Sequence, residues 1–165
     1  MDSIVTVLSI AIVYTFVAAT AFTYIVFRRR ETLQRLEVSQ KFIRDYNSER
    51  LFLASLTTVA AEDLLVALGK GEFPEKAQDY ERSIKGYLDL FTFFDDVGLA
   101  VQFNTAYEPI LEEYFGESVI QLYENNEQLI YAFRQIRENN NLFKSFERLV
   151  GRWSFKGTRD GSKAS

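Results

Sequence analysis

The chain has neither cysteine nor histidine among its 165 residues. The lack of cysteine excludes disulfides and thiol nucleophiles, and the lack of histidine excludes imidazole acid–base pairs and histidine ligands to zinc or haem. Proline occurs twice and glycine eight times, so few positions interrupt a helix. No segment alternates with the two-residue period of a strand. The sequence therefore predicts an all-α fold.

Charge is unevenly distributed along the chain, although the net charge is only −4. Residues 28–50 and 126–165 are net basic, whereas residues 51–125 are strongly acidic. No basic stripe is interleaved with aromatic residues as it would be in a nucleic-acid-binding surface. We therefore expect no nucleic-acid partner.

Residues 3–27, SIVTVLSIAIVYTFVAATAFTYIVF, contain no charged side chain. As a helix they would extend roughly 37 Å, enough to cross a hydrocarbon core of about 30 Å with some tilt. The segment predicts a transmembrane anchor over residues 1–27. A cleaved leader, suggested by Ala19-Thr20-Ala21, and a buried core helix are the alternatives.

Arg28, Arg29 and Arg30 follow this run directly. Basic residues at one flank favour the cytoplasmic side, which predicts a single-pass protein of the cell (inner) membrane with its N-terminus outside. The three arginines would also contact lipid headgroups. A ridge of small residues, which lets helices approach closely, recurs every four positions at Ala11, Thr15, Ala19 and Thr23. It predicts transmembrane packing against a partner, with chance alignment as the alternative.

The remaining chain predicts a basic juxtamembrane helix over 28–47, a cytoplasmic helical bundle over 48–155 and a disordered tail over 156–165. Within the bundle we expect helices at about 49–68, 75–103, 117–139 and 142–155. A capping box at Thr105–Glu108 would begin a further short helix that ends at Gly116.

Three charged side chains project onto apolar helical faces, at Asp63, Arg137 and Glu147. Because a lone buried charge is costly, we expect Arg137 to pair with an inward carboxylate. Glu147 is the first choice and Asp63 the second. Such a buried ion pair would fix helix register, and a functional polar site is the alternative.

The acidic motifs FFDDVG, at 93–98, and AEDLL, at 61–65, invite a metal or acid–base interpretation. By helical position Asp96 points away from the apolar face and Asp95 lies at its edge, so solvated carboxylates are favoured. We predict no catalytic residue, no metal and no cofactor. Trp153 is expected to close the bundle, with an exposed partner contact as the alternative.

From about Leu51 the chain resembles the DUF4760 family of small helical proteins of uncharacterised function. The stretches FFDDVGLAVQFNTAYEPILEEYFGESVIQLYE and LIYAFRQIRENNNLFKSFERLVGRW carry the resemblance. It implies an N-terminal span followed by a helical cytoplasmic part, and it implies no reaction.

These observations favour a non-catalytic, membrane-anchored interaction module or accessory subunit of a membrane complex. Its expected partners are membrane lipid and either a membrane protein or further copies of itself. The alternatives are an oligomeric membrane-active effector in phage or stress defence and an enzyme with carboxylate-held metal.

Overall fold

The structure, a computed structural model, describes the backbone of residues 2–56, 60–70 and 77–161. Within these ranges it describes the side chains of residues 16–17, 19–48, 60–69 and 78–155. The described backbone forms helices without strands, which confirms the all-α prediction. The helices are α1 (Asp2–Leu56), α2 (Ala61–Lys70), α3 (Ala77–Gln102), α4 (Glu108–Ile136) and α5 (Lys144–Gly161).

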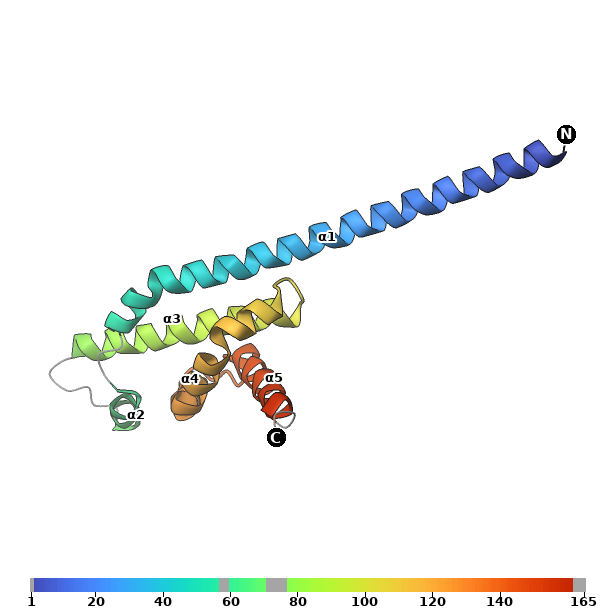
Figure 1. Ribbon diagram of the computed structural model, residues 1–165. Helices are drawn as coiled ribbons and strands as arrows, with labels where there is room; N and C mark the ends of the chain where they lie inside the picture. Colours follow the sequence, from blue (N-terminus) through green and yellow to red (C-terminus); the bar gives the residue numbers. More distant parts are fainter. Residues whose placement is uncertain (1, 57–59, 71–76, 162–165) are drawn as a thin grey trace.

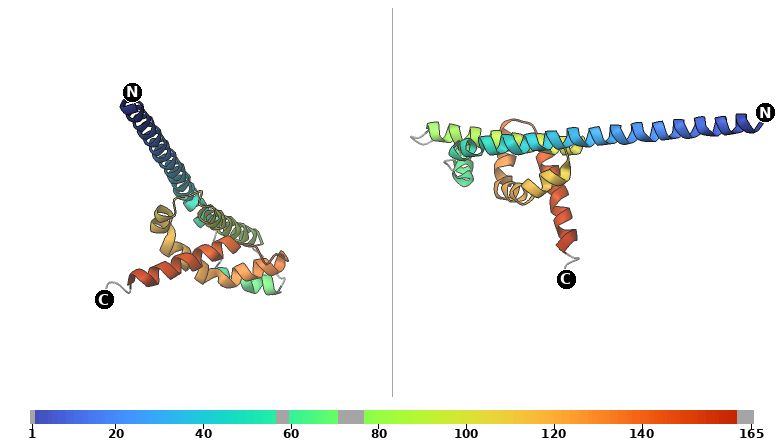
Figure 2. Two further views of the ribbon diagram at one scale, coloured as in Figure 1. Left: turned by 90° about the vertical axis from the view of Figure 1, so that its right-hand side faces the viewer. Right: turned by 45° about the horizontal axis from the view of Figure 1, so that its top comes forward.

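The chain is arranged as a helical bundle from which half of α1 projects (Figure 1). The second half of α1 lies along α3 and also contacts α4, while α5 packs on α3 and α4, and α2 packs on α4. The first half of α1 extends beyond the bundle in all the ribbon views (Figure 2). The molecule therefore consists of a packed body and an unaccompanied helical projection.

The predicted transmembrane anchor is not supported. Among the described residues no helix is both long enough and apolar enough to cross a membrane. The predicted orientation and location stay predictions.

Several predicted boundaries differ from the observed ones. α1 continues past residue 47, where the juxtamembrane helix was predicted to end, and α4 continues through Gly116. No proline follows Gly116, and good helix formers such as Glu117, Gln121 and Leu122 continue α4 beyond it. The capping box does not form: α4 begins after Tyr107 without a side-chain cap. α5 reaches Gly161 and so includes residues 156–161 of the predicted tail, whereas 162–165 lie outside the described residues.

The core is built from large aromatic side chains contributed by α3, α4 and α5. Phe91, Phe94, Phe115 and Phe146 are fully buried. The Phe94 ring lies 5.7 Å from that of Phe146 and 5.6 Å from that of Phe115, centroid to centroid. Each such ring contributes about 1.5–3 kcal/mol through burial. This cluster takes up four of the chain's 15 phenylalanines.

The second half of α1 is fixed to the bundle by polar contacts as well as by apolar packing. The Tyr107 backbone N–H donates to Ser39 Oγ at 2.7 Å, and Ser39 is fully buried. Arg35 Nη1 donates to Asn104 Oδ1 at 2.9 Å. Tyr46 contacts the Phe115 ring at 5.1 Å. Because α1 is one continuous helix, these contacts also set the direction of its projecting half.

Candidate functional site

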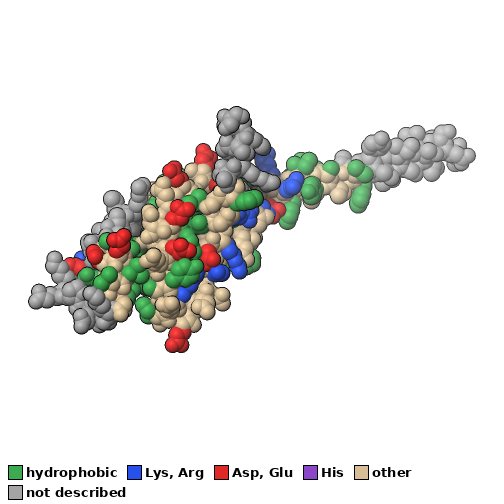
Figure 3. Space-filling model, turned by 90° about the horizontal axis from the view of Figure 1, so that it is seen from below, with side chains coloured by type: hydrophobic (Ala, Val, Ile, Leu, Met, Phe, Trp, Pro, Cys, Tyr) green, Lys and Arg blue, Asp and Glu red, His purple; other side chains and the backbone are tan. Residues whose placement is uncertain are grey.

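The projecting part of α1 exposes a series of large apolar side chains. We call residues 16–27 the arm. Phe16, Phe22 and Phe27 expose 74%, 70% and 68% of their surfaces. Three aromatic rings at such exposure leave on the order of 300–500 Å² of apolar surface in contact with solvent, comparable to the largest patch on a typical monomer. Figure 3 shows hydrophobic side chains following the arm and basic ones near its base.

Apolar side chains leave the arm in every direction around the helix axis. At about 100° per residue, Phe16, Phe22 and Tyr24 point to three different sides. The threonines do not interrupt this surface, because their hydroxyls bond to their own helix: Thr20 Oγ1 donates to Phe16 O and Thr23 Oγ1 to Ala19 O, both at 2.8 Å. The arm therefore has no polar face that would suit a solvent-exposed amphipathic helix.

Two residues of the predicted packing ridge, Ala19 and Thr23, line a shallow groove on the arm. The groove encloses about 480 Å³ between larger side chains that include Phe16, Tyr24 and Phe27. The side chains of the other two ridge residues, Ala11 and Thr15, lie outside the described residues.

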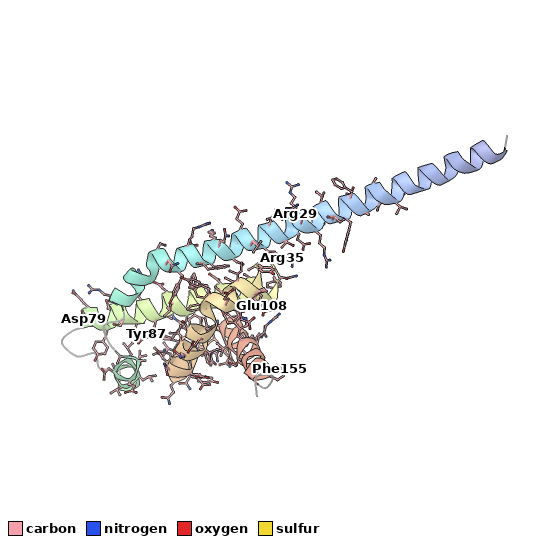
Figure 4. All side chains as sticks on the ribbon, viewed as in Figure 1. Arg29, Arg35, Asp79, Tyr87, Glu108 and Phe155 are labelled. Atoms are coloured by element: carbon pink, nitrogen blue, oxygen red, sulfur yellow. The ribbon has the colours of Figure 1, made fainter. Side chains whose placement is uncertain are left out.

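Arg28, Arg29 and Arg30 are all exposed where the arm ends. The guanidinium carbon of Arg28 lies 6.0 Å from the centre of the Tyr24 ring, a cation–π contact. Figure 4 labels Arg29 on the projecting part of α1 and Arg35 where α1 meets the bundle, close to Glu108. The basic cluster thus stands just outside the packed body.

A second groove lies between α4 and α5. It encloses about 480 Å³ and combines apolar residues with carboxylates; its lining is Glu112, Gly116, Glu117, Ile120, Gln121, Glu124 and Trp153. We call it the acidic groove. Sequence analysis did not find it, because its lining comes from two helices whose relative placement depends on tertiary packing.

Trp153 closes the bundle, as predicted. Only 2% of its surface is exposed, and its Nε1–H donates to Glu108 Oε1 at 3.3 Å. Glu108 also pairs with Arg152. The first turn of α4 is thereby joined to the middle of α5.

The predicted buried ion pair exists with a different cation. Arg134, with 5% of its surface exposed, donates from Nη2 to Glu147 Oε2 at 2.8 Å and from Nε to Leu142 O at 2.8 Å. Arg137 is exposed and Asp63 is exposed, so both assignments to the interior were wrong. The α4 helix ends at Ile136, which places Arg137 beyond the buried seam.

Lys144 is a second cation for Glu147, at 3.0 Å. Burial raises the pKa of the Glu147 carboxyl, but hydrogen bonds from Lys144 and Arg134 outweigh burial and lower the pKa overall. This cluster satisfies its own charges, which indicates a structural role. In the described part of the chain no group of three or more Asp, Glu, His or Cys side chains is placed to hold a metal ion.

Asp95 makes a contact that sequence analysis missed. Its Oδ1 accepts hydrogen bonds from the backbone N–H groups of Ser145 and Phe146, at 2.8 and 2.9 Å. A carboxylate from α3 thus caps the first turn of α5, where unsatisfied N–H groups and the helix dipole favour negative charge.

Asp96 is exposed, as predicted. Partial burial and the neighbouring Asp95 charge raise the pKa of its carboxyl.

We expect Asp95→Ala to lower the free energy of unfolding by about 1–2 kcal/mol, the usual cost of losing an N-terminal cap. The neighbouring variant Asp96→Ala should leave it unchanged or raise it slightly, because it removes a like charge beside Asp95. Urea denaturation followed by circular dichroism compares the two. Equal stability of both variants would contradict the capping role.

The described residues form a packed helical body from which one apolar helix projects (Figure 1). The chain belongs to the DUF4760 family, a domain of unknown function, whose model matches residues 5–153. The predicted family is thus confirmed, and the match begins well before Leu51, within α1. No curated protein and no solved structure matches the chain.

Proposed function

We propose that this protein is a non-catalytic interaction module that assembles through the arm of α1. The observation that carries this proposal is the exposure of apolar side chains on all sides of the arm. A helix that is apolar all round is normally surrounded by other apolar groups. One partner helix would cover only one side, so we infer that more than one helix packs around the arm.

Further copies of the same chain are the simplest source of those helices. Each copy supplies an identical arm, and symmetric self-assembly is the commonest form of oligomer. The rigid attachment of α1 through Ser39 and Tyr107 favours assembly, because an arm held in one direction loses less conformational entropy on binding than a flexible segment would.

Sedimentation velocity of the purified full-length chain in mild detergent tests this function. We expect a defined oligomer for the natural chain. The variant Phe22→Gln/Phe27→Gln should raise the dissociation constant about a hundredfold, since two apolar side chains lose their burial. The control Phe103→Gln/Phe155→Gln changes two phenylalanines that are each 67% exposed outside the arm, and should assemble like the natural chain. The proposal would be overturned if the natural chain is monomeric, or if the dissociation constant rises equally in the arm variant and in the control.

A further inference from the structure

The acidic groove offers a surface that is apolar within and negatively charged at its rim. Ile120 supplies partly exposed apolar lining, Trp153 lies almost fully buried at the groove, and Glu112, Glu117 and Glu124 supply the charge. Glu117 and Glu124 are exposed, so their carboxylates are accessible to a ligand. Such a groove suits a segment that carries cations beside apolar side chains.

The chain itself contains a segment of that chemistry. Ile25 and Phe27 are 62% and 68% exposed, and Arg28, Arg29 and Arg30 follow them directly. Because α1 is a continuous helix fixed to the bundle through Arg35 and Ser39, the segment cannot fold back onto its own groove. Only the segment of another copy can reach it.

The position of the groove agrees with such a contact. Trp153 lies at the groove and bonds to Glu108, and Glu108 stands near Arg35 at the end of the bundle from which α1 leaves (Figure 4). Copies whose arms run side by side in the same direction would bring the basic segment of one copy near this end of its neighbour, because Arg28 lies only about 10 Å of helix from Arg35. Complementary charge would then fix the register and orientation of the copies.

We propose that the acidic groove of one copy binds residues 25–30 of a second copy. This inference rests on the proposed function, since it names the second contact within the same assembly. The apolar arm supplies most of the affinity, and the groove supplies alignment that depends on ionic strength.

A charge-swap experiment on the full-length chain in mild detergent tests the contact. Arg29→Glu/Arg30→Glu and, separately, Glu117→Arg/Glu124→Arg should each raise the dissociation constant of the assembly about tenfold at low salt. The chain with all four changes should return to the affinity of the natural chain. The control Glu81→Arg/Asp89→Arg makes the same change of charge at exposed positions of α3 and should have no effect.

The groove contact is supported if the fourfold variant regains the affinity of the natural chain and if salt weakens the natural assembly. If the natural chain assembles but the groove variant matches the α3 control, or if the fourfold variant stays weak, the groove contact is overturned while assembly through the arm stands. If the natural chain is monomeric, both proposals fall.

Discussion

Replacing Gly98 with alanine should lower the free energy of unfolding by about 3 kcal/mol, the upper end of the usual cost of overpacking. A Cβ atom at this position would stand 2.4 Å from the backbone oxygen of Ser145 and 2.7 Å from its carbonyl carbon. These are backbone atoms of α5, so no side-chain rotation can relieve the clash. Helices α3 and α5 would have to separate, which would also stretch the Asp95 cap on Ser145.

Gly151→Ala is the matched control for this prediction. Gly151 lies in α5, and a Cβ there meets no other atom within 4 Å. Alanine should therefore raise the free energy of unfolding by about 0.5–1 kcal/mol through its better helix propensity. Urea denaturation measures both variants, and a Gly98→Ala chain as stable as Gly151→Ala would refute the close helix approach.

Replacing Arg134 with methionine should cost about 2–3 kcal/mol. The change removes both hydrogen bonds of the guanidinium, so Leu142 O loses a donor at 2.8 Å and Glu147 loses its buried cation. This loss of unfolding free energy is smaller than for a wholly buried ion pair, because the Glu147 side chain is 31% exposed and Lys144 remains beside it. Arg137→Met, at the exposed neighbouring position, should change stability by less than about 0.5 kcal/mol. If thermal denaturation shows that Arg137→Met destabilises the protein more than Arg134→Met, Arg137 is the buried cation instead.

The same cluster predicts a dependence of stability on pH. Because the folded state lowers the pKa of Glu147 below its ordinary value of 4.5, this carboxylate stabilises the fold above that pH, and the stabilisation is lost as pH falls through the folded pKa. The stability difference between the natural chain and Glu147→Gln should therefore be largest near pH 7 and shrink below about pH 4.5. A difference that stays constant from pH 7 to pH 3 would contradict the ion pair.

Helix content was predictable because it depends on local pattern. The scarcity of glycine and proline and the three- and four-residue spacing of apolar positions located α3 to within two residues of its observed ends. Boundaries that depend on tertiary contacts were not predictable in this way. The start of α5 is capped by Asp95, fifty positions earlier in the chain, and nothing in the sequence near Asn141 could show that.

The charged residues show the same division between local and tertiary information. A helical wheel identified Glu147 correctly, because α5 is regular around it. It placed Arg137 on the buried seam by assuming that the helix continued to 139, whereas α4 ends at Ile136 and Arg134 occupies the interior. Asp63 was assigned to the centre of an apolar face, but Leu64 and Ala67 turn inward instead and leave it exposed.

The arm was visible in the sequence as an uncharged run, but its surroundings were not. An uncharged helix satisfies its own backbone, and its sequence alone does not distinguish a lipid covering from a protein covering. We propose neighbouring arms as the covering, and the fixed direction of α1 favours such assembly. The acidic groove could not be predicted at all, since it arises where α4 and α5 meet.

Cross-linking through single introduced cysteines tests assembly through the arm most directly, because the natural chain has no cysteine to interfere. Phe16→Cys, Phe22→Cys and Tyr24→Cys, which point to three sides of the arm, should each form intermolecular disulfides under mild oxidation, while the exposed control Phe103→Cys should not. Arm cysteines that never cross-link, and that lipid vesicles shield from a water-soluble maleimide, would contradict the account and assign the arm to lipid instead.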